Sequence, residues 1–320
     1  MDQTCVTIVI PTFNMANFIG IAISSCLKQT YKNIKIIVCD NASNDNTRAV
    51  ISQFNDERIT YYRHELNIGA IANFNFAIEK TSSNYLKFLE ADDFLHINAI
   101  ERQMLALKQN DNVGLVSCGK YFIDGDNSII GEHVIKHSRL IKSPYSFFRF
   151  FLMGNEFGTP SDVLINLEVF EKKLLNFDSL YESYLNDWDL WFRISQKCNT
   201  IILNEKLTYV RRHLGQIGNS QSLNNKDIFV NFKMIDKLHT SNFAYFVSIL
   251  HISSAFLVRA IKKCIKHKFK QNTILYFVST SRIIVQNSTG LHYILSFFYM
   301  LFLYPFILLF QKIADKFSIL

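Results

Sequence analysis

The chain has 320 residues, of which 49% are hydrophobic and 19% are charged, and its formal net charge is +7. This length suits one large α/β domain with a smaller appendage, and the composition excludes a wholly disordered chain because it can bury a core. The basic excess would suit nucleic acid, an anionic membrane or an anionic substrate, but no aromatic-interleaved RNA-binding pattern accompanies it, so we expect no nucleic-acid partner.

The first part of the chain alternates short apolar runs with segments of helical periodicity. The run at residues 6–10, which ends at Pro11, is rich in β-branched residues and predicts a buried strand. Further strands are expected at residues 34–39, 58–62, 85–89 and 113–118, and helices at 16–29, 47–54, 69–80 and 99–108. Strands that alternate with helices of this length predict a parallel, doubly wound sheet, in which ligands bind beyond the carboxyl ends of the strands.

The pattern is less regular after this point. Residues 120–160 mix Asp, Gly and aromatic residues, and regular structure is expected again as a helix over 182–193 and a strand over 200–203. From about residue 225 onward the sequence predicts helices with basic and apolar faces. The six cysteines are scattered without a CxxC pair, which favours reduced, buried thiols in a cytosolic protein.

Acidic residues follow two of the predicted strands. Asp92 and Asp93 end the fourth strand, and adjacent carboxylates there would suit Mg²⁺ or Mn²⁺, which can also hold diphosphate oxygens. The alternative is a helix N-cap, because Asp is common where a strand leads into a helix. Asp40 ends the second strand and could accept the imide N–H of a uracil-type base, or it could form an Asx-turn.

Two later segments carry further candidate groups. Asp187 lies in an amphipathic segment, where a carboxylate beside aromatic surface could have the raised proton affinity of a general base; the alternative is an exposed acid in a first helical turn. Asp189 cannot share the face of Asp187, since residues i and i+2 of a helix point apart. Arg211, Arg212 and His213 follow a strand-like segment and could contact a diphosphate, or they could form a solvated basic loop.

Taken together, these segments resemble the family 2 glycosyltransferases, which have the GT-A fold. The matching stretches, in the family's order over the first two thirds of the chain, are residues 6–14, 25–31, 36–47, 67–69, 91–93 and 187–193. The resemblance implies an inverting transfer of a sugar from a nucleotide-diphosphate sugar to an acceptor hydroxyl. A dinucleotide-binding oxidoreductase on a similar sheet is excluded because no Gly-rich turn follows the first strand. A catalytically silent, membrane-associated nucleotide-sugar-binding protein is the remaining alternative.

The resemblance also implies a role for individual residues. Asp187 would be the general base, with Asp189 as the alternative because Asn186 stands where the family often has Glu. Asp93 would ligate Mn²⁺ or Mg²⁺, although the motif begins with Ala91 rather than with an acid. The residues expected to bind the nucleotide sugar are Pro11, Thr12, Asn14, Asp40, Asn67, Asp92, Arg212 and His213.

The C-terminal region predicts membrane attachment. Residues 291–310 are almost entirely apolar, which favours a re-entrant or interfacial helix pair broken at Pro305 over a helix buried in the core. Lys262, Lys266 and Lys270 would share one face of a helix, which could contact an anionic membrane surface or simply face solvent. Because the N-terminus lacks the pattern of a signal peptide, we expect a peripheral or monotopic protein on the cytoplasmic side of the inner membrane.

These predictions define two regions and a substrate class. Residues 1–225 would form the GT-A domain, with a nucleotide-binding half at 1–110 and an acceptor-side half at 111–225, and residues 226–320 would form a helical, membrane-associating extension. The resemblance suggests that the acceptor is a saccharide linked to polyprenyl diphosphate, as in the biosynthesis of O-antigen or capsule polysaccharides.

Overall fold

We analysed a computed structural model of the chain. The structure describes residues 4–143, 155–178 and 186–212. The chain divides into two compact units, which are Met1–Phe147 with Asn155–Asn219, and Phe148–Gly154 with Ser220–Leu320. All of the described residues belong to the first of these units, so the fold below is the fold of that unit.

Several of the predictions concern residues outside the described part of the chain. His213, the apolar run at 291–310 and the basic face of Lys262, Lys266 and Lys270 all lie there. The boundary at residue 225 and the membrane-associating extension therefore stay predictions. Within residues 4–143, 155–178 and 186–212, no helix is long and apolar enough to cross a membrane.

The first half of the described chain alternates strands and helices, as the sequence predicts. The strands are β1 (Val6–Thr12), β2 (Ile34–Asp40), β3 (Ile59–Arg63) and β4 (Tyr85–Phe88), and the helices are α1 (Ile19–Leu27), α2 (Thr47–Ile51), α3 (Ala70–Lys80) and α4 (Ala99–Lys108). Every residue of β1 is buried, because the strand is central in the sheet and helices cover both of its faces. A strand covered in this way reads as a continuous apolar run, which explains why it is recognisable in the sequence.

The second half contains strands that the sequence pattern does not predict. Besides the longer β6 (Val113–Ile123), α6 (Asn186–Lys197) and β10 (Asn199–Arg211), it has β5 (Phe94–Leu95), β7 (Ile129–His133), β8 (Arg139–Ile141), β9 (Leu164–Asn166) and the 3₁₀ turns Pro160–Asp162 and Lys172–Leu174. Strands of two to five residues are too short to show a period of their own. The expected strand at 200–203 continues to Arg211 through two irregularities in its pairing with β6.

The strands form one sheet in the order β3-β2-β1-β4-β9-β6-β10-β5, with β7 on β6 and β8 on β10. The first four strands pair in parallel, β9 runs antiparallel between β4 and β6, and β10 runs parallel to β6. The expected α/β fold with a mostly parallel sheet is thus confirmed, with antiparallel strands inserted in its second half.

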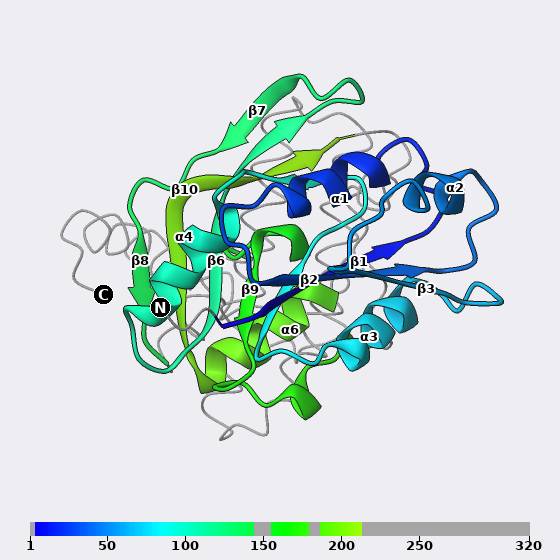
Figure 1. Ribbon diagram of the computed structural model, residues 1–320. Helices are drawn as coiled ribbons and strands as arrows, with labels where there is room; N and C mark the ends of the chain where they lie inside the picture. Colours follow the sequence, from blue (N-terminus) through cyan, green and yellow to red (C-terminus); the bar gives the residue numbers. More distant parts are fainter. Residues whose placement is uncertain (1–3, 144–154, 179–185, 213–320) are drawn as a thin grey trace, which may run out of the picture. The chain divides into compact units, whose positions relative to one another are not determined.

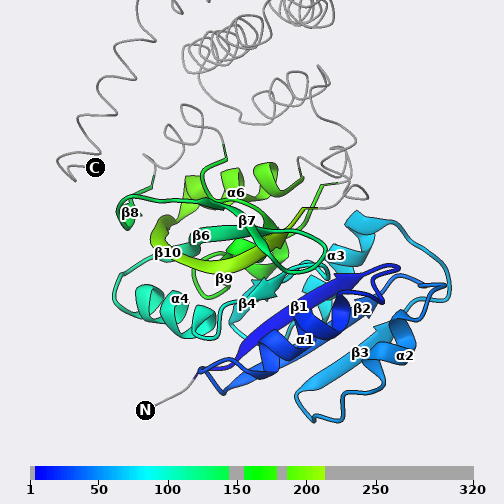
Figure 2. The same cartoon turned by 90° about the horizontal axis from the view of Figure 1, so that it is seen from above.

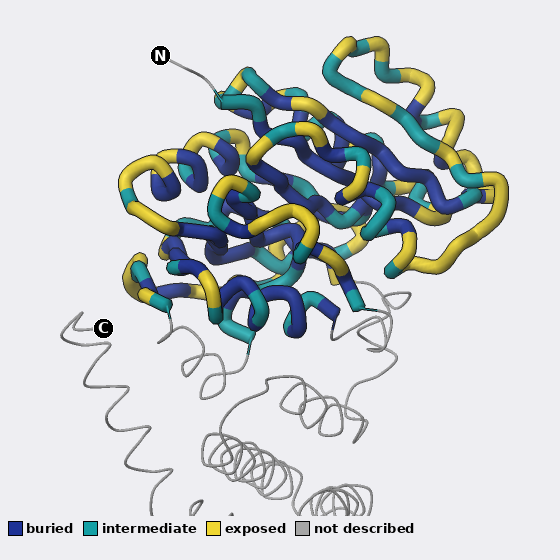
Figure 3. Tube along the Cα trace, turned by 90° about the horizontal axis from the view of Figure 1, so that it is seen from below, coloured by how far each residue is buried: buried dark blue, intermediate teal, exposed yellow. Residues whose placement is uncertain are grey.

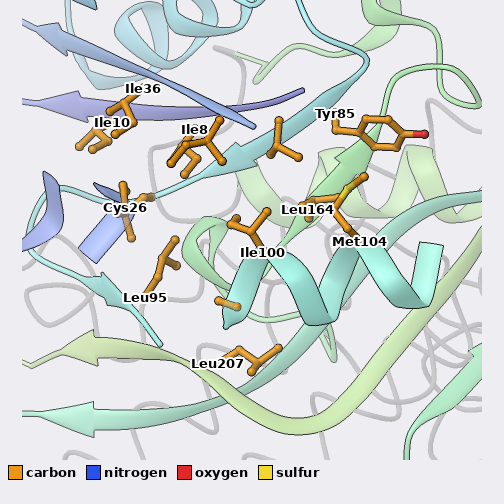
Figure 4. Close-up of a cluster of buried hydrophobic side chains, with 14 of the residues drawn as sticks. Ile8, Ile10, Cys26, Ile36, Tyr85, Leu95, Ile100, Met104, Leu164 and Leu207 are labelled. Atoms are coloured by element: carbon orange, nitrogen blue, oxygen red, sulfur yellow. The ribbon is translucent and has the colours of Figure 1, made fainter. Parts of the chain in front are cut away.

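Helices cover both faces of this sheet. Helices α1, α2 and α4 lie on one face, and α3 and α6 lie on the other (Figures 1 and 2). On the first face, Ile8 of β1 packs in one core cluster with Cys26 of α1 and Ile100 and Met104 of α4 (Figure 4). The strands are the most continuously buried part of the chain, whereas exposed residues gather in the loops and on the outer helix surfaces (Figure 3).

The second face has an aromatic core. The ring of Phe88 on β4 lies 6.0 Å from that of Phe74, 5.5 Å from that of Phe177 and 6.4 Å from that of Trp191. These contacts join α3, the segment after β9 and α6 to the same strand. They place the first turn of α6 near the carboxyl end of β4, where the predicted acidic site lies.

Candidate active site

The loops that follow β1 and β2 are joined by hydrogen bonds. The backbone N–H of Asn14 donates to Ser43 Oγ at 2.9 Å, and Asn14 Oδ1 accepts the backbone N–H of Asn44 at 2.9 Å. The N–H of Met15 donates to Thr47 Oγ1 at 2.9 Å. Asn14 adopts a φ of 55°, a left-handed conformation that Asn tolerates better than most residues. Asn14, expected to bind the nucleotide sugar, therefore has its side-chain oxygen engaged in holding the two loops together.

Asp40 lies fully buried at the end of β2, in register with Thr12 at the end of β1. One carboxylate oxygen accepts the N–H of Ser43 at 2.8 Å, and the other accepts the hydroxyl of Tyr61 at 2.7 Å and lies 3.7 Å from Arg63 Nε. The bond to Ser43, three residues later in the chain, is a local turn contact of the kind that the sequence offers as the alternative to nucleobase binding. Thr12 Oγ1 is buried and has no hydrogen-bond partner among the described residues, so it is the unused polar atom at this point of the sheet edge.

A third loop, which follows β3, joins the same group. Asn41 donates through Nδ2 to Asn67 Oδ1 at 2.9 Å and accepts the N–H of Ile68 at 2.8 Å. Gly69 takes a φ of 87°, which a side chain would strain, and its N–H donates to Asn67 Oδ1. Phe13, which sequence reasoning missed, leaves 40% of its surface exposed directly after Thr12. An exposed ring there could stack on a nucleobase.

Three carboxylates follow β4 in the segment Glu90–Asp93. Asp93 is 2% exposed, its Oδ1 accepts the backbone N–H of Arg211 at 2.9 Å, and its buried Oδ2 has no hydrogen-bond partner within the described part of the chain. Burial and the charge of Asp92 raise the pKa of Asp93 well above its usual value. The helix-cap alternative is wrong, because the segment leads into β5 and the N-cap of α4 is Asn98.

Glu90 is a second residue that sequence reasoning missed. Glu90 and Asp92 are both partly exposed, unlike Asp93. Burial and the charges of Asp93, Asp92 and Asp187 raise the pKa of Glu90 well above its usual value. The available signal was the place of Glu90 directly after the expected strand at 85–89 and beside Asp92 and Asp93; the structure closes this segment as a turn, in which the N–H of Asp93 donates to the carbonyl of Glu90 at 3.0 Å.

Asp187 lies in the first turn of α6, where one oxygen accepts the N–H of Trp188 at 2.8 Å and the other accepts Asn155 Nδ2 at 3.3 Å. Burial raises the pKa of Asp187 to about 7. Asp189 instead points to the ion pair that it forms with Arg193 at 2.8 Å. Asp189 thus pairs with a cation of its own helix, and the assignment of Asp187 as the general base stays a prediction.

Buried lysines offset part of this negative charge. Lys120 forms a buried ion pair with Asp162, and its charge opposes the rise of the pKa of Asp187. Lys87 is fully buried, its Nζ donates to Gln103 Oε1 at 3.1 Å, and burial lowers its pKa. Lys87 and Lys120 thus lie in the protein interior, and both interact electrostatically with Asp93.

The end of β10 reaches the acidic segment from the other half of the sheet. Arg211 bonds to Asp93 as described, and the guanidinium of Arg212 lies 4.5 Å from the ring centre of Phe122. The N–H of Arg212 donates to the carbonyl of Ile123 at 2.8 Å. Contact of Arg212 and His213 with a diphosphate stays a prediction.

The predicted residues fall into two groups along one edge of the sheet. The first group contains residues at the ends of β1 and β2 and in the loops that follow β1 and β3: Pro11, Thr12, Asn14, Asp40 and Asn67. The acidic segment and Asp187 form the second group, which comes from two segments distant in sequence. Among the described residues, no three acidic, His or Cys side chains converge closely enough to hold a metal ion alone.

Comparison with protein families gives one match over more than half of the chain. The profile described as Glycosyl transferase family 2 matches residues 7–172. An Escherichia coli protein named UDP-Glc:alpha-D-GlcNAc-diphosphoundecaprenol beta-1,3-glucosyltransferase WfgD is 37% identical over 147 residues, which are 45% of this chain and 57% of that protein. The chain thus spans little more than half the length of this relative.

Solved structures show the same fold at low sequence identity. Staphylococcus aureus TarS 1–349 in complex with UDP-GlcNAc has a TM-score of 0.64 and 13% identity, and the match covers 88% of this chain and 81% of that one. A mannosyltransferase from Pyrobaculum calidifontis in complex with GDP-Man and Mn²⁺ has a TM-score of 0.54 and 13% identity, covering 94% of this chain and 88% of that one. The GT-A fold expected from the sequence is confirmed.

Proposed function

Because the chain belongs to glycosyl transferase family 2, we propose that it is an inverting glycosyltransferase, which moves a sugar from a nucleotide-diphosphate sugar to a hydroxyl group of a lipid-linked saccharide. One observation supports this proposal: α6, which carries Asp187, packs through Trp191 against Phe88 of β4, two residues before Glu90, so the candidate base and the candidate metal-binding segment come from neighbouring elements. The donor loops after β1, β2 and β3 lie at the same edge of the sheet.

The donor would bind in these three loops. Phe13 offers an exposed ring for stacking on the base, and the buried side chains of Thr12 and Asp40 end the two strands beside it. Asn67, fixed by Asn41, would face the ribose or the sugar. A UDP-sugar is the donor we propose, because the E. coli relative is named for UDP-Glc and the TarS structure holds UDP-GlcNAc.

A divalent ion fits the acidic segment. Carboxylate oxygens are the ligands that Mn²⁺ and Mg²⁺ prefer, and Asp93 Oδ2 is a buried oxygen without a hydrogen-bond partner among the described residues. Such ions are often held by one or two carboxylates together with substrate phosphates, so a complete cluster of three protein ligands is not required. The predicted ligand, Asp93, is the least accessible of the three acids. We therefore propose that Asp93 Oδ2 would hold the ion from within the fold, while the more exposed Glu90 and Asp92 would share that ion with a diphosphate.

When bound, the ion would neutralise charge on the departing diphosphate. Asp187 would take the proton from the acceptor hydroxyl while that oxygen bonds to the anomeric carbon and the bond to the diphosphate breaks on the opposite face. The electron pair of the broken bond leaves with the diphosphate, and the configuration at the anomeric carbon inverts. A pKa of about 7 suits this role, because a general base works best when its pKa lies near the working pH.

The acceptor proposal rests on the named relative. Its name specifies GlcNAc linked to diphosphoundecaprenol. We propose the same chemical class here: a saccharide on polyprenyl diphosphate, used in the synthesis of a surface polysaccharide of the O-antigen or capsule type. The enzyme would meet this acceptor on the cytoplasmic side of the inner membrane, with the basic and apolar C-terminal region on the anionic membrane surface.

The test is a transfer assay with defined substrates. UDP-Glc, UDP-GlcNAc and GDP-Man are each incubated with GlcNAc-diphosphoundecaprenol, with Mn²⁺ or with a chelator, and the anomeric configuration of the product is read by NMR. We expect Mn²⁺-dependent transfer with inversion, and its loss in Glu90→Gln, Asp92→Asn and Asp187→Asn. Asp126→Asn, which changes an exposed acid, is the matched control. A product with retained configuration would contradict the mechanism, and donor binding without transfer would support the catalytically silent alternative.

A further inference from the structure

Arg211 is fully buried at the end of β10, and the mechanism above does not use its side chain. A buried guanidinium is costly unless its donors are satisfied, so its partners indicate what it does. Nε donates to the backbone carbonyl of Asp92 at 2.8 Å. The two terminal nitrogens donate to the turn between β6 and β7, through the carbonyls of Asp124 and Gly125 and the side-chain oxygen of Asn127.

Arg211 contacts the acidic segment through its backbone as well as through its side chain. The backbone N–H of Arg211 donates to Asp93 Oδ1, while its Nε holds the carbonyl of Asp92. These two bonds fix the segment on both sides of the peptide bond that joins Asp92 to Asp93. The backbone that carries the Asp92 carboxylate is thus tied to β10 rather than left as a free turn.

The chemistry of the contact requires arginine. A guanidinium presents five donors in a rigid planar fork, whereas a lysine ammonium offers three donors at one point and cannot reach both the acidic segment and the turn. The carboxylates of Asp92, Asp93 and Asp124 attract the charge of Arg211, which offsets part of the repulsion within the acidic segment. The side chain also lies 4.4 Å from the ring centre of Phe18, the residue that precedes α1.

We propose that Arg211 is a positioning residue, which clamps the acidic segment to the β6–β7 turn and so sets the Asp92 carboxylate for a divalent ion and the diphosphate that the ion binds. This inference rests on the proposed function, since it assigns Asp92 to that ion. Arg211 itself touches neither ion nor substrate; it acts through the backbone of Asp92 and the side chain of Asp93.

Two variants weaken the clamp to different degrees. Arg211→Lys keeps the charge and removes the fork. Asn127→Gly removes one acceptor of the fork in an exposed turn, and it keeps the backbone because Asn127 has a φ of 67°, which glycine adopts freely. The matched control is Arg102→Lys, because Arg102 forms an equivalent fork with Glu205 at 2.7 and 2.8 Å, away from the acidic segment.

The experiment measures Mn²⁺ binding in the presence of UDP by electron paramagnetic resonance, together with kcat and KM for the donor and unfolding in urea. We expect Arg211→Lys to weaken Mn²⁺ binding about 10- to 100-fold, the range found when a partner of a metal ligand is removed. Asn127→Gly should weaken it about two- to fivefold and lower the urea midpoint less than Arg211→Lys does, since only one acceptor of the fork is lost. Arg102→Lys should bind Mn²⁺ as the unchanged protein does.

The outcomes separate this inference from the proposed function. If the unchanged protein binds Mn²⁺ with UDP and both clamp variants bind it equally well, Arg211 has no positioning role. If Arg211→Lys does not fold, Asn127→Gly decides, because its substitution preserves the backbone. If the unchanged protein binds no Mn²⁺ in the presence of UDP, the metal assignment of the proposed function fails and this inference fails with it.

Discussion

The pKa of Asp187 predicts how the transfer rate depends on pH. Burial raises this pKa to about 7, and a protonated carboxyl group cannot accept the proton of the acceptor hydroxyl. Below this value the ionised, active form of the free enzyme therefore falls about tenfold with each pH unit, so kcat/KM at pH 6 should be about one tenth of its plateau and at pH 7 about one half. An ordinary exposed Asp, with its pKa near 3.9, would give no such dependence in this range.

The assay is a series of initial rates at low donor concentration from about pH 5.5 to about pH 8.5, with constant Mn²⁺ and ionic strength. Asn155→Ala removes the hydrogen bond that favours the ionised form of Asp187, so the midpoint of the profile should move to higher pH. Asp189→Asn removes a carboxylate of the same helix that pairs with Arg193, so it should leave the midpoint unchanged. A flat profile across this range, or a midpoint that follows Asp189 instead, would refute the assignment of the base.

Three further predictions concern stability. Asp187→Asn should stabilise the fold against urea at pH 8 but not at pH 4, because the raised pKa makes the native state lose stability as the pH rises from 3.8 to about 7; at ~1.4 kcal/mol per pKa unit the gain is at most ~4 kcal/mol. Gly158→Ala should cost about 2 kcal/mol or more in unfolding free energy, since the new Cβ would lie 2.2 Å from Asp162 Oδ2 at a φ of +86°, whereas Gly125→Ala meets no atom within 4 Å and serves as its control. Asp189→Asn should lower the urea midpoint by an amount that corresponds to about 1–3 kcal/mol, because Asp189 is buried and paired; an unchanged midpoint would show that the Arg193 ion pair is not formed.

The sequence predicts those parts of the fold whose residues show a recognisable pattern within a short window. The runs at 6–10 and 34–39 are recognisable because both faces of these strands are largely buried, so apolar residues predominate in them, with Thr7 and the exposed Lys35 as the exceptions. Strands β7, β8 and β9 depend instead on pairing with residues distant in sequence, and no short window carries that information. The mostly parallel sheet is therefore expected from the sequence, but the places of its antiparallel strands are not.

The site shows the same division. The place of Asp40 and Asp92 follows from the ends of predicted strands, which chain order fixes. The burial of Asp93 depends on a bond to Arg211, which is 118 positions later, and nothing near Asp93 in the sequence indicates it. The choice between Asp187 and Asp189 could have been made from the sequence, because Arg193 stands at i+4 from Asp189, the spacing of a helical ion pair.

The hydrogen bonds between the donor loops have a consequence for how donor preference could change. Asn14 contacts the loop after β2 through its backbone and its side chain, and Asn41 holds the loop after β3 through the nitrogen and the oxygen of its side-chain amide. A substitution in one loop therefore changes the position of the loops that are hydrogen-bonded to it. The free-energy changes caused by substitutions that contact one another do not add. Changes of the accepted nucleotide should arise through pairs of compensating substitutions across loops, so libraries that vary Asn14 together with Ser43 and Asn44 should yield functional variants that single-site scans miss.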